Sequence, residues 1–224
     1  MTQPVRQVPL VLQVSEQFRR LIATGAWPVG SKIPGENHLA GELGVSRGTV
    51  REALRSLSLT GLLEPRVGDG TYVRATDEIA GVLVRDEPDA LTHVLDARAG
   101  LEAAAARLAA QNSSAGDLAL LAAAARDRDT AHDAGDLAAY VAADAEFHRA
   151  LVRASGNPLL IRLYDAVAEV AAKSIQDTAS LPEDPRIIGA HDVLTAAVLS
   201  HNPDAAVQAA YALIDAVKAT RRLP

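Results

Sequence analysis

Apolar residues recur at three- and four-residue steps along most of the chain, a spacing that predicts helices with one buried face. The first such stripe lies in residues 9–24 and is formed by Val11, Val14, Phe18, Leu21 and Ile22. Gly25 follows it where a helix would end. A shorter stripe begins at Glu36 and stops at Gly44, and a third follows Ser46. We therefore predict three helices in this part of the chain.

The second and third predicted helices are separated by a turn of three residues, Gly44 to Ser46. Gly44 can adopt the left-handed conformation that such a turn requires. Ser46 can cap the third helix, because its side-chain oxygen can accept a backbone N–H near Thr49. Val50 continues the apolar stripe on the inner face. Two helices joined in this way form the helix-turn-helix pattern, here over roughly residues 36–55.

The next segment, GLLEPRVGDGTYVRA at residues 61–75, no longer has helical spacing. Two short apolar runs flank a turn made by Gly68, Asp69 and Gly70. This pattern predicts a two-stranded hairpin directly after the third helix. A helix-turn-helix followed by such a hairpin is a winged helix, with Gly68 at the tip of the wing.

From residue 89 onward the helical spacing is nearly continuous, and no strand pattern is visible. Interruptions rich in Gly, Asn, Ser and Pro leave six predicted helices, at roughly 89–111, 115–134, 136–154, 158–180, 185–200 and 204–221. An all-α bundle of this size can enclose a ligand pocket between its helices. We therefore predict a mainly α protein, with a winged helix-turn-helix domain over 1–75, a linker over 76–88 and an all-α domain over 89–224.

Charge divides the chain at the same place. Residues 1–75 carry nine Lys and Arg against six Asp and Glu, although the whole chain has a net charge of −6. A mildly basic N-terminal module suits a nucleic-acid partner. The chain has no cysteine, so a metal ion would need nitrogen and oxygen ligands. Because neither a signal peptide nor an apolar run of about 18 residues is present, we expect a soluble cytoplasmic protein without a membrane partner.

The third predicted helix carries Arg47, Gly48, Thr49 and Arg51 at its N-terminal end, outside its apolar stripe. The first turns of such a helix read base edges in a major groove, where an arginine can bond guanine through two nitrogens. Thr49 and the free N–H groups of the first turn can hold phosphate oxygens. On an isolated helix, Arg47 and Arg51 would more often form an ordinary solvated face. The predicted hairpin that follows favours DNA reading.

Residues 9–75 resemble the DNA-binding domain of the GntR family of bacterial transcription regulators. The family pattern is matched by Leu39-Ala40, Leu43 to Arg47, Thr49 to Leu54, Leu57, Gly61-Leu62 and Gly70 to Val73. The resemblance implies that Arg47 and Arg51 contact bases and that Gly68 approaches the minor groove. The candidate DNA-contacting residues are Ser46, Arg47, Gly48, Thr49, Arg51 and Gly68. Two departures from the family, Gly35-Glu36-Asn37 in place of Ser-Glu-Arg and Gly48 in place of Thr, Ala or Pro, bear on base preference.

Few residues of the second domain could carry chemistry. Asp144 and His148 stand four residues apart on one predicted helix, so a carboxylate oxygen and an imidazole nitrogen can reach one ion. His191 lies on a later helix. Taken alone, an Asp/His pair at this spacing is more often a surface contact than a pair of ligands. The three residues also suggest an alternative, a metal-dependent hydrolase, although no general base or nucleophile is evident beside them.

The stretches LDARAGLEAAAARLAA, DAEFHRALVRASGN and HDVLTAAVLSHNPDAA resemble FCD, the ligand-binding domain of the FadR subfamily within GntR. Its metal-containing members use an Asp, the His four residues on, and a His from each of the last two helices. Asp144, His148 and His191 match the first three ligands, and Leu213 stands where the fourth would be. The resemblance implies one divalent ion, Zn, Ni or Mn, and the loss of a ligand implies a lower affinity than a four-ligand site has. Water or an effector carboxylate could complete the coordination.

The resemblance also points to Arg98, because family members often place an arginine near the effector on the first helix of this domain. Its guanidinium can grip a carboxylate, and a salt bridge to Glu102, four residues on, is an equal alternative. The predicted function is a homodimeric transcription regulator, usually a repressor in this subfamily, and not an enzyme. It would bind a palindromic operator, and a small organic acid beside Arg98, His148 and His191 would modulate that binding. An architectural DNA binder with a vestigial sensor domain is a further alternative.

Overall fold

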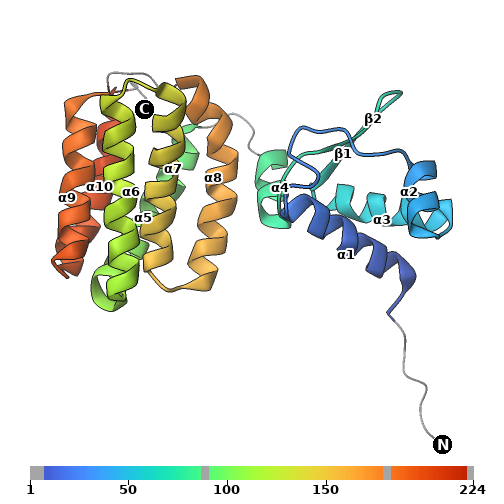
Figure 1. Ribbon diagram of the computed structural model, residues 1–224, viewed down its shortest axis with the longest axis horizontal. Helices are drawn as coiled ribbons and strands as arrows, with labels where there is room; N and C mark the ends of the chain where they lie inside the picture. Colours follow the sequence, from blue (N-terminus) through green and yellow to red (C-terminus); the bar gives the residue numbers. More distant parts are fainter. Residues whose placement is uncertain (1–7, 87–90, 179–182, 221–224) are drawn as a thin grey trace, which may run out of the picture. The chain divides into compact units, whose positions relative to one another are not determined.

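The computed structural model describes residues 8–86, 91–178 and 183–220 (Figure 1). The chain divides into two compact units, Met1–Pro88 and Asp89–Pro224. The first contains three helices and a hairpin followed by a fourth helix, and the described residues of the second form helices joined by short turns, without a strand. The predicted fold class, a winged helix-turn-helix followed by an all-α bundle, is confirmed. Among the described helices, none is both long and apolar enough to cross a membrane.

The first unit is built on three helices, α1 (Leu10–Ala23), α2 (Glu36–Leu43) and α3 (Arg47–Leu59). Their inner faces enclose one apolar core, made chiefly by Val14, Phe18, Ile22, Leu39, Val50, Ala53, Leu57 and Leu62. Strands β1 (Leu63–Arg66) and β2 (Gly70–Val73) pair antiparallel, with Leu63 opposite Val73 and Arg66 opposite Gly70. Because Leu63 and Val73 are buried in the same core, the base of the wing is fixed to the three helices.

The segment before α2 also pairs with the hairpin, which the sequence pattern did not predict. The Gly30 N–H donates to the Val73 carbonyl at 2.8 Å, the Val73 N–H donates to Ser31 at 3.0 Å, and the Ile33 N–H donates to Thr71 at 2.9 Å. Residues 30–33 therefore lie along β2 like a short third strand. This pairing braces the wing from the side opposite β1.

The span expected as a linker includes helix α4 (Glu78–Asp86). Its backbone touches the turn after α3, where Gly61 has φ +80°. A Cβ added to Gly61 would lie 2.4 Å from the Gly81 carbonyl oxygen, so only glycine permits this approach. Glu78 accepts a hydrogen bond from Arg19 of α1 at 2.7 Å. The start of this span is thus docked on the first unit.

The second unit consists of long helices packed side by side (Figure 1). They are α5 (Leu91–Asn112), α6 (Ala115–Asp133), α7 (Leu137–Ala154), α8 (Pro158–Thr178), α9 (Pro185–Leu199) and α10 (Pro203–Thr220). Each begins and ends within two residues of the prediction. The reason is local chemistry, because Ser114, Asp136, Asn157 and Asp184 accept backbone N–H groups at the helix starts.

Alanine dominates the core of the second unit. α5 contributes Ala103, Ala106, Ala109 and Ala110, and α10 contributes Ala206, Ala209 and Ala210, all buried. Such small side chains let two helix backbones approach closely, and α5 packs against α10. α5 also packs against α7 and α8, while α6 packs against α7 and α9. The polar site described below is built from α5, α6, α7 and α9.

Candidate functional site

The start of α3 is open to solvent. The Ser46 side chain accepts the Thr49 N–H at 3.1 Å, and Gly44 takes the left-handed conformation with φ +64°, as predicted. Val50, on the inner face of α3, is buried, whereas Arg47, Gly48 and Arg51 are exposed. The cap fixes the first turn, so its cationic side chains project from a rigid helix end. This arrangement fits a helix that enters a DNA groove.

Arg51 has a carboxylate partner that sequence reasoning missed. Its Nη2 donates to Glu36 Oε2 at 2.9 Å, and its Nε lies 3.2 Å from each carboxylate oxygen of Glu36. This hydrogen bonding lowers the pKa of Glu36, which stays ionised. The signal in the sequence was Glu36 as the first residue of α2, between the two positions, Gly35 and Asn37, that depart from the family pattern. Glu36 holds the Arg51 side chain in a defined orientation.

The wing ends in an exposed turn held by one carboxylate. Gly68, at the tip, has φ +77° and is exposed. Asp69 accepts a hydrogen bond from Lys32 Nζ at 2.9 Å and one from the Tyr72 hydroxyl at 2.8 Å. The Arg66 guanidinium lies over the Tyr72 ring, 4.1 Å from its centroid. The tip therefore combines a small backbone profile with cationic side chains beside it, as a contact with DNA requires.

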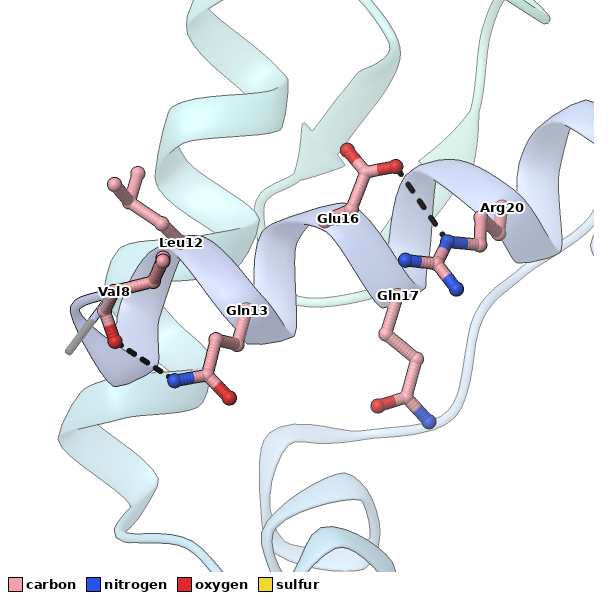
Figure 2. Close-up of a pocket in the computed structure, with 6 residues that line it drawn as sticks. All are labelled: Val8, Leu12, Gln13, Glu16, Gln17 and Arg20. Atoms are coloured by element: carbon pink, nitrogen blue, oxygen red, sulfur yellow. Dashed lines mark hydrogen bonds and ion pairs between the residues drawn. The ribbon is translucent and has the colours of Figure 1, made fainter.

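An open groove on the outer face of α1 is lined by Val8, Leu12, Gln13, Glu16, Gln17 and Arg20 (Figure 2). The Gln13 amide donates to the Val8 carbonyl at 2.7 Å. The two charged side chains of this groove pair with each other, because Arg20 Nε lies 3.5 Å from Glu16 Oε1. These six residues contain no set of groups suited to catalysis or metal binding.

The second unit brings Asp144 and His148 of α7 together with His191 of α9. Asp144 Oδ1 lies 3.3 Å from His191 Nε2, and Asp144 Oδ2 lies 3.8 Å from His148 Nε2. One ligand atom from each residue lies within 4.8 Å of the other two. Both histidines are buried. The three residues are therefore not a solvated surface contact.

The hydrogen bonds of the two imidazoles determine which nitrogens carry protons. His148 Nδ1 lies 2.8 Å from Glu102 Oε2, and His191 Nδ1 lies 2.8 Å from the Ile187 carbonyl. Both partners can only accept, so each Nδ1 donates. Burial lowers the pKa of His148, which favours its neutral form. The Nε2 atoms of both rings face Asp144, and His191 Nε2 is buried without a hydrogen-bond partner. The Asp144 carboxylate and the two Nε2 atoms are the kinds of ligand that a divalent ion takes.

Arg98 forms the salt bridge that was one of its two predicted roles, and both residues are buried. Its Nε donates to Glu102 Oε1 at 2.8 Å, and the Glu102 side chain is 0% exposed. Burial would raise the pKa of Glu102, yet Arg98 and His148 lower it to about 2. Glu102 thus joins Arg98 to His148. The signal for Glu102 was its place four residues after Arg98.

Arg98 also lines a cavity of about 220 Å³, together with Asp144, His148 and Tyr164. His191 does not line this cavity and joins the cluster through Asp144. Leu213 is fully buried in the apolar core that also contains Phe147. It cannot ligate an ion, so the fourth ligand of the resemblance is replaced by hydrocarbon.

A second buried arginine, Arg128 of α6, was not predicted as a site residue. Its Nε donates to Asp144 Oδ1 at 2.8 Å, and its Nη2 donates to the Tyr140 hydroxyl at 2.9 Å and to Glu183. Burial would raise the pKa of Asp144, but the two histidines and Arg128 hold it well below its ordinary value. A sequence signal existed, because Arg128 continues the buried stripe of Leu121 and Ala124 at helical spacing.

Comparison with known proteins agrees with both units. The model of the FCD domain matches residues 93–216, and the model described as bacterial regulatory proteins, gntR family, matches residues 10–73. The chain belongs to the gntR family of bacterial regulatory proteins. It carries the FCD domain that the resemblance indicated, and it is a DNA-binding transcription regulator.

Individual relatives span nearly the whole of this regulator. The protein described as regulatory for the L-lactate dehydrogenase operon of Escherichia coli (strain K12) is 29% identical, covering 94% of this chain and 85% of the relative. The transcriptional repressor NanR of Escherichia coli (strain K12) is 27% identical, with 98% and 87% covered. The structure of Streptococcus agalactiae GntR matches with a TM-score of 0.57 and 30% identity, covering 94% of this chain and 99% of that one. These relatives are regulators, which leaves the hydrolase alternative without support.

Proposed function

We propose that this regulator acts as a homodimeric repressor that binds a palindromic operator through α3 and the wing. The observation that carries the proposal is the capped, solvent-exposed start of α3, where Arg47 and Arg51 project beside Thr49. Arg47 and Arg51 would read bases in the major groove, while Ser46, Gly48 and Thr49 would lie against the phosphates. Gly68 would approach the minor groove. Two copies related by a two-fold axis would read two half-sites.

The second unit would sense a small carboxylate. Its cavity of about 220 Å³ is smaller than the pockets that hold drug-sized ligands, which favours an effector of few heavy atoms. Arg98 lies on its wall and would bind the carboxylate of the effector. The family's repressor NanR supports the proposed sign of regulation.

A divalent ion, zinc, nickel or manganese, would be held by Asp144, His148 and His191. Their convergence and the unpaired Nε2 of His191 support this assignment. The ion would supply a fixed positive charge that an effector carboxylate can approach. Glu102 would orient His148 from the other side of the ring.

The experiment that tests the sensor role is a thermal-shift screen of carboxylic acids of two to six carbons, with and without zinc. We expect at least one acid to raise the melting temperature of the parent chain and not that of Arg98→Gln. The same acid should change the affinity of the full chain for its operator. An acid that stabilises the protein and leaves operator affinity unchanged would favour the architectural alternative, in which the second unit is vestigial.

A further inference from the structure

The carboxylate at the centre of the candidate metal site already has a cationic partner. Arg128 Nε donates to Asp144 Oδ1 at 2.8 Å, and His191 Nε2 lies 3.3 Å from the same oxygen. The Arg128 side chain is 1% exposed, so solvent screens this interaction weakly. A cation that approached the two Nε2 atoms would therefore meet both the carboxylate and a buried guanidinium bonded to it.

Other groups hold the guanidinium in place. Nη2 donates to the Tyr140 hydroxyl at 2.9 Å and to Glu183, and the guanidinium lies 5.2 Å from the centroid of the Tyr140 ring. These partners come from α7 and from the residue before the cap of α9. Moving Arg128 away from Asp144 would break these bonds around a side chain that is only 1% exposed. The guanidinium is thus a fixed part of the site.

Two guanidinium groups already offset part of the negative charge around Asp144. Among the described residues of the cluster, the carboxylates are Asp144, Glu102, Glu183 and the half-exposed Asp129, which lies 3.5 Å from Arg128 Nη1, and the guanidinium groups are Arg98 and Arg128. Arg98 is paired with Glu102, whereas Arg128 is bonded directly to the ligand Asp144. A divalent ion on Asp144 would lie near the positive charge of Arg128, and the two would repel each other.

The geometry points to Arg128 as a built-in cation that competes with the divalent ion for Asp144. The inference rests on the proposed metal site and deepens it. Arg128 neutralises Asp144 in the absence of metal, and together with the loss of a ligand at Leu213 it makes the site a weak one. The chain would then respond to changes in metal concentration, instead of retaining an ion permanently.

Zinc affinity tests this role directly. The full chain, stripped with chelator, is titrated with zinc in competition with a chromophoric indicator, for the parent and for Arg128→Met, Arg128→Lys and Arg126→Met. An adjacent arginine changes the proton affinity of a carboxylate by about 10- to 1000-fold, so we expect Arg128→Met to bind zinc at least about tenfold more tightly than the parent. Arg128→Lys keeps the charge and should stay within about threefold of the parent. Arg126 is exposed on the same helix, so Arg126→Met is the matched control and should change nothing.

Zinc binding that is equal or weaker in Arg128→Met, with the fold intact by circular dichroism, would overturn the inference, because the guanidinium would then orient Asp144 or play no part. His191→Ala in the Arg128→Met background separates this result from failure of the metal site itself. Unchanged zinc affinity in that double variant would place the ion elsewhere.

If Arg128→Met does not fold, Glu183→Gln replaces it as the test variant. Removing that carboxylate leaves the cluster more positive and should weaken zinc binding at least threefold, whereas no change would contradict the competition.

Discussion

Glu36 and Arg51 form an ion pair that joins the first residue of α2 to helix α3. Arg51 Nη2 donates to Glu36 Oε2 at 2.9 Å, and Arg51 Nε lies 3.2 Å from both oxygens. The pair does two things at once. It holds the arginine in one orientation in the free protein, and it places a negative charge on the surface that we propose contacts DNA.

The first prediction concerns Glu36→Gln. Loss of the negative charge should raise the affinity for random duplex DNA about two- to fivefold, because phosphate attraction dominates nonspecific binding. Loss of the fixed orientation should lower the ratio of operator affinity to random affinity severalfold. Fluorescence anisotropy with both duplexes at one salt concentration measures the two effects. Glu42→Gln, on the same helix and exposed, is the control; equal ratios in the two variants would show that Glu36 does not position Arg51.

The second prediction concerns the glycine contact that docks α4. A Cβ on Gly81 would lie 2.6 Å from the Thr60 carbonyl oxygen, which is backbone and cannot move freely. We expect Gly81→Ala to lower the free energy of unfolding by about 1–3 kcal/mol, as overpacking does. Gly41→Ala in α2 is the control, because a Cβ there meets nothing within 4 Å, and it should stabilise by up to about 1 kcal/mol. Urea denaturation measures both, and a neutral Gly81→Ala would mean that α4 is not held by this contact.

The third prediction restores the missing ligand. Leu213→His should destabilise the chelated protein by about 1–3 kcal/mol, because a polar ring replaces a fully buried apolar side chain. Added zinc should recover that loss and raise the melting temperature above that of the zinc-treated parent. Leu194→His, in the same core, is the control and should be destabilised without recovery. Equal zinc response in the two variants would show that position 213 does not face the ion.

Much of the fold could be predicted because its signals are local. The Ser46 cap, the left-handed Gly44 and the breaks between the long helices each depend on a few neighbouring residues, and all appear in the structure. The two-stranded hairpin was predicted for the same reason. By contrast, the pairing of residues 30–33 with β2 depends on tertiary contacts and had no periodic signal.

The site could be predicted only in part. The spacing of Asp144 and His148 placed them on one helix face, but the approach of His191 came from the family resemblance, since no local pattern joins α7 to α9. Arg128 was missed because Arg126 and Arg128 alternate with Asp127 and Asp129, which is typical of a solvated face. The stripe of Leu121 and Ala124 favours Arg128 over Arg126, and the packing of α6 against α7 buries it. Its partners could not be read from one helix.

The central claim is that α3 reads DNA through Arg47 and Arg51, and its most direct test is equilibrium binding to a duplex selected from a random pool by the parent chain. The parent, Arg47→Ala, Arg51→Ala and the exposed control Arg162→Ala are compared on the selected and a random duplex at one salt concentration. We expect each of the first two variants to lose about 1–3 kcal/mol on the selected duplex, roughly 5- to 150-fold, with a much smaller loss on random DNA. Parent-like binding of both variants to both duplexes would contradict the assignment of α3 as the reading helix.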